Sequence, residues 1–157
     1  MTETEFELIM RRQINPVLRL ACSYLQNRTE AEDAAQEVFL RLFRSDTDFE
    51  NEIAERAWLL KVTANVCKNI LRSPRIKKRC EFDVSSLLTD DTTKDEHIVF
   101  EAVMQLPEKY RIPIHLFYCE DYSVKEISKL TGINESTIRT RLQRGRNIIK
   151  TLIEGKE

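Results

Sequence analysis

A run of basic and amide side chains near the end of the chain carries groups that hydrogen-bond to nucleic acid. From Ser136 to Thr151 the sequence holds arginines, a glutamine and an asparagine but no acidic residue. Guanidinium groups fork onto guanine or hold phosphates, and amide side chains pair with adenine. A helix of about 3.6 residues per turn places these groups opposite an apolar stripe. The side chains that we expect to contact DNA are Ser136, Thr137, Arg139, Thr140, Arg141, Gln143 and Arg144.

The residues just before this run predict a helix-turn-helix. Ser123 and Glu126 have the spacing of a capping box, which opens a short helix through Leu130. Gly132 supplies the positive φ of a tight turn, and Asn134 is placed to cap the second helix. An amphipathic surface helix with a solvated basic face is the simpler alternative, but the turn residues and the acid-free run argue against it. The last third of the chain is therefore predicted to bind DNA.

A helix with an unusual polar face is predicted nearer the N-terminus. Thr29 and Glu32 have the spacing of a capping box, and this helix is expected to continue to about Arg44. Its outer face combines acidic and amide side chains with one large apolar residue, and we call it the acidic ridge: Asp33, Gln36, Glu37 and Leu40. Such a ridge repels phosphates and suits a basic protein partner. A single exposed leucine is also ordinary, so the pattern alone leaves both interpretations open.

A third helix, expected from about Glu55 to Arg72, carries basic and amide side chains beside an aromatic ring. Its apolar stripe is expected at Leu59, Val62, Val66 and Ile70, with Thr63 and Cys67 at the margin. The other side is lined by Trp58, Lys61, Asn65, Lys68, Asn69 and Arg72. This mixture suits single-stranded or distorted nucleic acid, whose bases stack on rings or are held outside the duplex. A lone tryptophan on a helix is more often part of the core, so both roles stay open for Trp58.

Helical periodicity divides the chain into three blocks. It is strong over about residues 3–71 and returns over about residues 96–152. We therefore predict an all-α chain of two small helical domains, residues 1–73 and 96–157, joined by a flexible linker over residues 74–95. Only three glycines, four prolines and 32% charged residues agree with an all-helical fold.

In the second domain, Pro107 is expected to begin a helix that runs to about Cys119. Its apolar set, which includes Tyr110, should pack beneath the helix-turn-helix, with His115 at the edge of that core. Gly145 lies inside the apolar stripe of the helix after Ser136. Glycine weakens a helix by roughly 1 kcal/mol, but it also leaves room for closer packing.

The net charge of −1 means that nucleic-acid binding must depend on local clusters. One such cluster is the stretch from Lys68 to Arg79, which holds six basic residues and no acid. The N-terminus is acidic and no apolar run reaches the roughly 18 residues of a membrane span. We therefore expect neither a signal peptide nor a transmembrane helix, and a cytoplasmic location.

The residues that most often hold metals are scattered. The four cysteines are Cys22, Cys67, Cys80 and Cys119, and the two histidines are His97 and His115. No Cys-X-X-Cys pair occurs, so reduced thiols without a metal site, cofactor or disulfide framework are expected. The sequence also has no phosphate-binding loop, nucleophile elbow or other catalytic constellation. The chain is therefore expected to have neither catalytic residues nor a small-molecule substrate.

With these segments in order, the chain resembles a bacterial RNA polymerase sigma factor of the extracytoplasmic-function group in the sigma-70 family. The matching stretches are residues 31–40 (AEDAAQEVFL), 57–65 (AWLLKVTAN), 106–127, which begin with Leu-Pro, and 137–146 (TIRTRLQRGR). They follow the family's order and extend over nearly the whole chain. The resemblance implies a region 2-like domain followed by a region 4-like helix-turn-helix domain.

The resemblance also implies a role for each polar face. The acidic ridge would dock on the coiled coil of the polymerase β′ subunit. The face that carries Asn65, Lys68, Asn69 and Arg72 would engage the minus-ten promoter element as it melts. The helix after Asn134 would read the minus-thirty-five element. The implied partners are core RNA polymerase with its β′ and β subunits, promoter DNA, and an anti-sigma factor that can hold the protein at the membrane.

Two other functions compete with this one. A stand-alone helix-turn-helix regulator would bind an operator by itself, usually as a dimer on a palindrome. A helical adaptor would use its basic helices to meet an acidic partner. A sigma factor, in contrast, would bind DNA weakly alone and tightly only together with polymerase.

Overall fold

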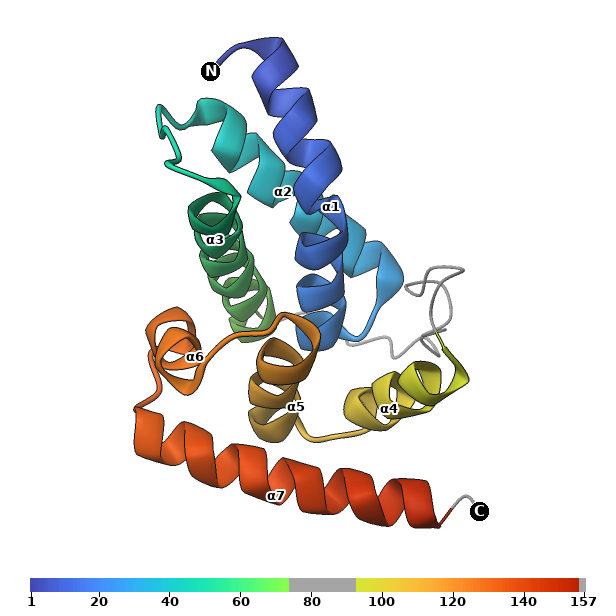
Figure 1. The fold of residues 1–157 in the computed structure, drawn as a ribbon. Helices are drawn as coiled ribbons and strands as arrows, with labels where there is room; N and C mark the ends of the chain where they lie inside the picture. Colours follow the sequence, from blue (N-terminus) through green and yellow to red (C-terminus); the bar gives the residue numbers. More distant parts are fainter. Residues whose placement is uncertain (74–92, 156–157) are drawn as a thin grey trace. The chain divides into compact units, whose positions relative to one another are not determined.

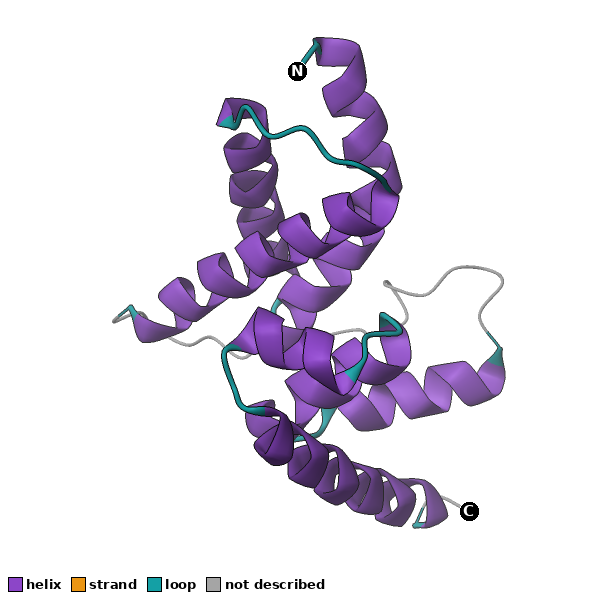
Figure 2. Ribbon diagram, turned by 60° about the vertical axis from the view of Figure 1, so that its left-hand side comes forward, coloured by secondary structure: helices purple, strands orange, loops and turns teal. Residues whose placement is uncertain are grey.

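The computed structural model describes residues 1–73 and 93–155, and in these ranges every regular element is a helix (Figure 2). The predicted all-α fold is confirmed. The chain divides into two compact units, residues 1–81 and 82–157, which are described separately. Residues 74–92, with most of the predicted linker, the basic cluster after Arg72 and Cys80, lie outside the described residues.

Three helices form the first unit, and each packs against the other two (Figure 1). They are α1 (Glu3–Leu25), α2 (Arg28–Arg44) and α3 (Glu52–Arg72). The fully buried side chains at the centre come from all three helices and include Leu20, Val38, Leu42, Leu59 and Leu60. Burial of this shared apolar surface is the main force that holds the three helices together.

The start of α2 differs from the prediction. Asn27, and not Thr29, caps the helix, because the Oδ1 atom of Asn27 accepts a hydrogen bond from the backbone N–H of Glu30 at 3.0 Å. Asparagine caps a helix at least as well as threonine. The preceding residue, Gln26, takes a left-handed φ of 51° at the end of α1, which turns the chain before Asn27.

The buried side of α3 also differs from the predicted stripe. Thr63 and Cys67 have no exposed surface, whereas Val62 and Ile70 are only half-buried. The helix contacts both α1 and α2, so its buried surface is wider than a single stripe and also includes Leu60. The Thr63 hydroxyl donates to the carbonyl oxygen of Leu59 at 2.7 Å, which lets a polar residue sit in the core.

A buried carboxylate links α1 to α3. The Glu55 side chain accepts hydrogen bonds from both Nε and Nη2 of Arg12, at 3.2 and 2.9 Å. Gln13 donates to the same carboxylate at 3.0 Å, and its own Oε1 accepts from Nε of Arg56 at 3.0 Å. The hydrogen bond with Glu55 also raises the pKa of Arg12. A buried polar network of this kind is satisfied in only one register of the two helices.

The second unit is organised around its last helix. It contains α4 (Lys94–Met104), α5 (Glu108–Ile114) with its π-helical continuation η2 (His115–Cys119), α6 (Val124–Thr131) and α7 (Glu135–Glu154). The first three α-helices of this unit lie along one side of α7 and contact it (Figure 1). Pro107 was expected as the first residue of this helix and lies at the position just before it, since α5 begins at Glu108. The wider π-helical turn follows Pro113, which cannot donate a backbone hydrogen bond.

His115 was expected at the edge of this core, but it lies at its centre. Its side chain has no exposed surface, and its Nε2 atom is 3.3 Å from Oε1 of Glu120, which is equally buried. This is an ion-pair separation without hydrogen-bond geometry. Burial disfavours the charged ring, but the Cys119 thiol and the Glu120 carboxylate outweigh it and raise the pKa of His115 to about 9.

The helices α5 and α7 approach closely at Gly145. A Cβ atom placed on Gly145 would lie 2.7 Å from Cγ1 of Ile114 and 3.5 Å from Cβ of Tyr110. Carbon atoms of real side chains do not pack at 2.7 Å, and Ile114 is fully buried and cannot move aside. The glycine is therefore required by close packing.

Replacing Gly145 by alanine is expected to destabilise the second unit by roughly 1–2 kcal/mol. Alanine gains about 1 kcal/mol of helix propensity, but overpacking a core costs about 1–3 kcal/mol and the backbone must also shift. Urea unfolding followed by circular dichroism measures the difference. Asn147→Ala, at an exposed position two residues on, is the control and should be neutral or slightly stabilising. A Gly145→Ala chain as stable as the wild type would contradict the packing argument.

The raised pKa of His115 predicts a pH-dependent stability. The folded pKa of about 9 lies above the ordinary value of 6.5. The stabilisation is therefore complete below pH 6.5 and is lost as the pH rises through about 9. Urea unfolding between pH 6 and pH 9.5 should show a falling free energy of unfolding, and His115→Gln should flatten this fall. The same slope in both proteins would assign the pH dependence to another group.

Candidate functional site

The predicted helix-turn-helix is present in α6 and α7. Ser123 caps α6 with both hydrogen bonds of the capping box, and Gly132 ends it with a φ of 77°. The Asn134 side chain accepts a backbone N–H of α7 at 2.8 Å. Buried Ile138 and Leu142 anchor the inner side of α7. Each local signal that the sequence offered for this motif is confirmed.

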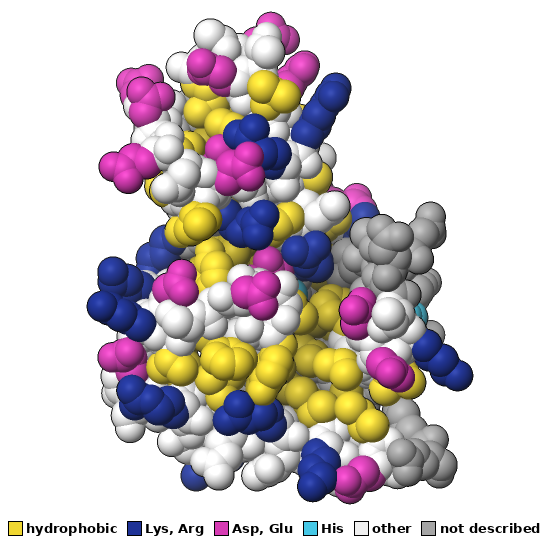
Figure 3. Space-filling view, viewed as in Figure 1, with side chains coloured by type: hydrophobic (Ala, Val, Ile, Leu, Met, Phe, Trp, Pro, Cys, Tyr) yellow, Lys and Arg dark blue, Asp and Glu magenta, His cyan; other side chains and the backbone are white. Residues whose placement is uncertain are grey.

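The predicted DNA-contacting residues of α7 lie on its outer side or its margins. Figure 3 shows Lys and Arg side chains along the visible face of this helix. Five of the seven are exposed, namely Ser136, Arg139, Thr140, Gln143 and Arg144, while Thr137 and Arg141 are half-buried. The Thr140 hydroxyl donates to the backbone carbonyl of Ser136 at 3.2 Å and is therefore turned toward its own helix.

Five of these α7 residues meet two residues of α5 that the sequence did not single out as DNA contacts. Together they line a pocket of about 270 Å³, which we call the α5–α7 pocket: Lys109, Tyr110, Ser136, Thr137, Thr140, Arg141 and Arg144. Arg139 and Gln143 lie outside it. Tyr110 was expected in the core but is half-buried at the pocket wall, because Ile112 and Ile114 supply the buried side of α5.

The basic face of α3 is exposed along most of its length. Lys61, Asn65, Asn69 and Arg72 are exposed, and Lys68 and Trp58 are half-buried. Their spacing places all six on one side of the helix. The Trp58 ring lies 5.8 Å from the ring of Phe49 in the segment before α3, so part of the ring is used for packing.

The acidic ridge on α2 is exposed, and it is more apolar than predicted. Leu40 is 46% exposed, and Phe43 beside it is 57% exposed, with its ring 5.3 Å from that of Phe6 in α1. Asp33 and Gln36 are exposed as well, whereas Glu37 is half-buried. The Glu37 carboxylate forms an ion pair with Nε of Arg41 at 3.1 Å.

An apolar groove of about 490 Å³ runs between α1 and α2 beside the acidic ridge. Its residues from α1 are Phe6, Met10, Ile14 and Leu18, and those from the ridge are Gln36 and Leu40. This groove was not predicted, because the acidic ridge is a pattern of α2 alone and the groove also needs α1. The sequence does contain a pattern that indicates the α1 side of the groove. The four α1 residues recur at every fourth position and so share one helix face.

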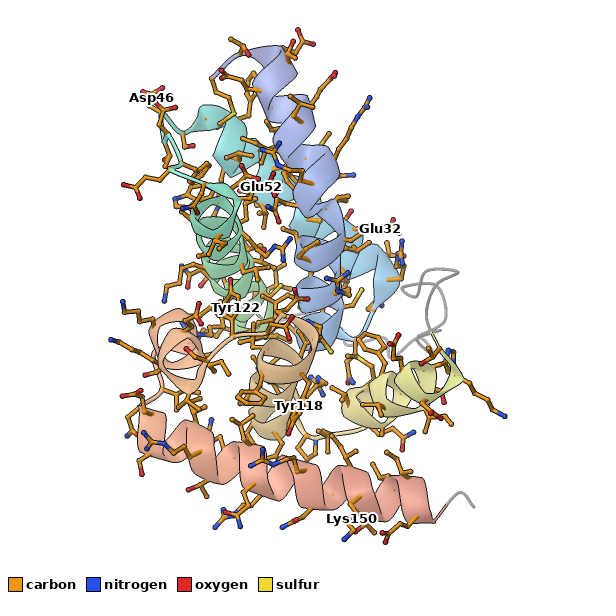
Figure 4. The ribbon with its side chains drawn as sticks, in the orientation of Figure 1. Glu32, Asp46, Glu52, Tyr118, Tyr122 and Lys150 are labelled. Atoms are coloured by element: carbon orange, nitrogen blue, oxygen red, sulfur yellow. The ribbon has the colours of Figure 1, made fainter. Side chains whose placement is uncertain are left out.

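A second apolar groove, of about 390 Å³, lies between α4 and α7. Figure 3 shows hydrophobic side chains gathered over this part of the unit, and the lining includes Val99, Val103, Ile149 and Ile153. Tyr118 projects toward α7 at the groove (Figure 4) and accepts a hydrogen bond from Nη1 of Arg146 at 3.0 Å. This surface was not predicted from the sequence either.

The described residues contain neither a metal-binding cluster nor a helix that could span a membrane. In residues 1–73 and 93–155, no three His, Cys, Asp or Glu side chains are grouped to hold a metal ion. None of the described helices combines the length and the apolar character needed to span a membrane. Cys22 and Cys67 are buried and Cys119 is half-buried. Burial raises the pKa of Cys22 to about 12.

Known proteins resemble this chain over both units. The family model for sigma-70 region 2 matches residues 9–75, and that for sigma-70 region 4 matches residues 97–149. The extracytoplasmic-function RNA polymerase sigma-E factor of Haemophilus influenzae is 30% identical, with 95% of this chain and 87% of that protein aligned. The RNA polymerase sigma factor SigV of Bacillus subtilis is 29% identical over 84% of this chain and 81% of its own length.

A solved structure shares the fold. The sigma factor RpoE of Bartonella quintana, crystallised with the anti-sigma factor NepR, superposes with a TM-score of 0.67. The alignment covers 97% of this chain and 96% of RpoE, at 19% sequence identity. At this identity the likeness concerns the arrangement of the helices alone.

Proposed function

Because this chain belongs to the extracytoplasmic-function group of the sigma-70 family, we propose that it is a promoter-specificity subunit of RNA polymerase. It binds the core enzyme and directs transcription initiation at a restricted set of promoters. The observation that carries this proposal is the order of the two family matches, region 2 over residues 9–75 and region 4 over residues 97–149. The alternative of a stand-alone regulator would leave the region 2 match without a role.

The polymerase-binding surface is proposed to be the acidic ridge together with the α1–α2 groove. Exposed Leu40 and Phe43 offer apolar surface that water does not favour, and Asp33 and Glu37 offer negative charge beside it. A basic helical partner satisfies both features, because its apolar residues fill the groove while its cations meet the ridge. The coiled coil of the β′ subunit is the partner that we assign to it.

The basic face of α3 is proposed to hold the minus-ten element. Lys61, Asn65, Asn69 and Arg72 are exposed and combine cations with amides. Cations attract the phosphates of a melted strand, and amides pair with unstacked bases. Trp58 keeps part of its ring accessible beside them and is proposed to stack on a base.

The outer side of α7 is proposed to enter the major groove at the minus-thirty-five element, as recognition helices of this motif do. The chemistry of transcription belongs to the polymerase, so the chain acts as a non-enzymatic cytoplasmic factor.

An anti-sigma factor is proposed as a further partner, which would mask the polymerase-binding surface until the anti-sigma factor is released. This proposal is supported by the resemblance to RpoE, which was crystallised with such a factor.

Reversing the charge of the acidic ridge is expected to abolish polymerase binding. Asp33→Lys with Glu37→Lys places like charges against a basic partner and should weaken affinity for core polymerase by roughly 100-fold or more. Fluorescence anisotropy of the labelled chain titrated with core enzyme measures this. The control is the double change Asp46→Lys and Asp48→Lys, at exposed acids in the loop before α3 (Figure 4, Asp46). Equal affinities for the two variants would contradict the docking assignment.

Promoter-specific transcription tests the function itself. The purified chain, added to core polymerase, should produce run-off transcripts from a discrete class within a promoter library. It should show little sequence-specific DNA binding without polymerase. Tight binding to a palindrome in the absence of polymerase, with no run-off transcripts, would instead identify a conventional regulator.

A further inference from the structure

The α5–α7 pocket gathers more positive charge than the recognition helix alone. Lys109 of α5 lines the same concave surface as Arg141 and Arg144 of α7. Within residues 1–73 and 93–155, none of these three cations forms an ion pair with a carboxylate. Glu108 and Glu135, the acidic neighbours in sequence, do not line the pocket. Three unneutralised cations around one hollow favour the binding of an anion.

Tyr110 joins the two walls of this pocket. It lines the pocket together with Lys109 and Arg144, and Nζ of Lys109 lies 4.9 Å from the centre of its ring. Desolvation disfavours the phenolate, but the nearby Lys109 and Arg144 outweigh it and lower the pKa of Tyr110. The contact with the ring holds Lys109 near its position before a ligand arrives, which reduces the entropy lost on binding.

The chemistry of the pocket selects a phosphate over other anions. Guanidinium groups bind phosphate oxygens in pairs, and lysine adds a compact point charge. The pocket lies along one shoulder of α7, whereas Arg139 and Gln143 lie outside it. A duplex read by the outer side of α7 carries its sugar-phosphate chain along the shoulders of the helix.

We propose that Lys109, Tyr110 and Arg144 form a clamp for a single backbone phosphate of promoter DNA. The inference rests on the proposed function, because it takes the ligand to be the minus-thirty-five duplex. It assigns Arg144 to phosphate, where the sequence left both guanine and phosphate open, and it leaves Arg139 and Gln143 to contact base edges. The clamp fixes the position of α7 in the groove, and the base contacts supply specificity.

Neutral phosphate analogues test the clamp in the assembled polymerase. Holoenzyme made with the full chain is bound to promoter duplexes in which one phosphate at a time near the minus-thirty-five element is a methylphosphonate. The wild type should lose affinity by roughly tenfold at one position. Holoenzyme with Lys109→Ala should bind the unmodified promoter with roughly tenfold lower affinity. Its affinity should not fall further when the methylphosphonate is placed at that position. Its slope of log affinity against log salt should be smaller by about 1.

Matched variants separate the clamp from a general loss of charge or of folding. Lys94→Ala removes an exposed lysine of α4 that does not line the pocket, and it should keep the affinity and the salt slope of the wild type. Tyr110→Phe keeps the ring and both cations, and it should lose part of the effect at the same phosphate. Thermal unfolding of each variant should match that of the wild type.

Three results would overturn the clamp. A loss in Lys109→Ala that depends on one minus-thirty-five base pair would make the pocket a base-reading site. An absence of coupling between Lys109 and every methylphosphonate would remove the phosphate contact. Binding of inorganic phosphate in the pocket without competition by promoter DNA would assign it to a free phosphorylated ligand. A wild-type holoenzyme that selects no promoter contradicts the proposed function instead, so the two failures are distinguishable.

Discussion

The contact between Ile114 and the backbone of α7 at Gly145 sets the geometry of the second unit. Because residue 145 has no side chain, α5 lies directly on α7, and Tyr110, one turn before Ile114, comes alongside the same helix. Tyr110 forms a wall of the α5–α7 pocket, and Ile114 also lines the apolar groove beside α4. One helix–helix distance therefore determines both a polar and an apolar surface, and a longer distance would change the two together.

Acidic, apolar and basic surfaces lie on different elements of the chain, and the first unit also carries the basic face of α3. The first unit combines a groove of apolar side chains with acidic groups on α2, and the second unit combines cations on α5 and α7 with the hydroxyl and amide groups of the recognition helix. A net charge of −1 is the sum of these separate regions. Proteins and DNA can therefore be attracted to different faces of the chain, since screening limits each field to about a Debye length of roughly 8–10 Å.

The sequence predicts well the features that one residue decides locally. Ser123 and Gly132 each have few alternatives at their positions, and the helix-turn-helix follows from them. At the start of α2, Asn27 and Thr29 are both good caps, so the choice depends on how the chain leaves α1. The grooves and the pocket require side chains from helices distant in sequence, such as Lys109 and α7. Periodicity identifies a stripe on each helix but not the helix that it faces.

The network around Glu55 has a consequence for how such a chain evolves. The carboxylate depends on Arg12 and Gln13 of α1, and Gln13 in turn accepts a hydrogen bond from Arg56. Losing any one member leaves a buried polar group unsatisfied, which costs more than the lost hydrogen bond contributed. Single substitutions here are therefore disfavoured, and we expect the seam between α1 and α3 to change only when several of its residues change together. The ion pair of Glu37 and Arg41 at the acidic ridge is not buried in this way, so the outer face can change its partners at a lower cost while the scaffold stays the same.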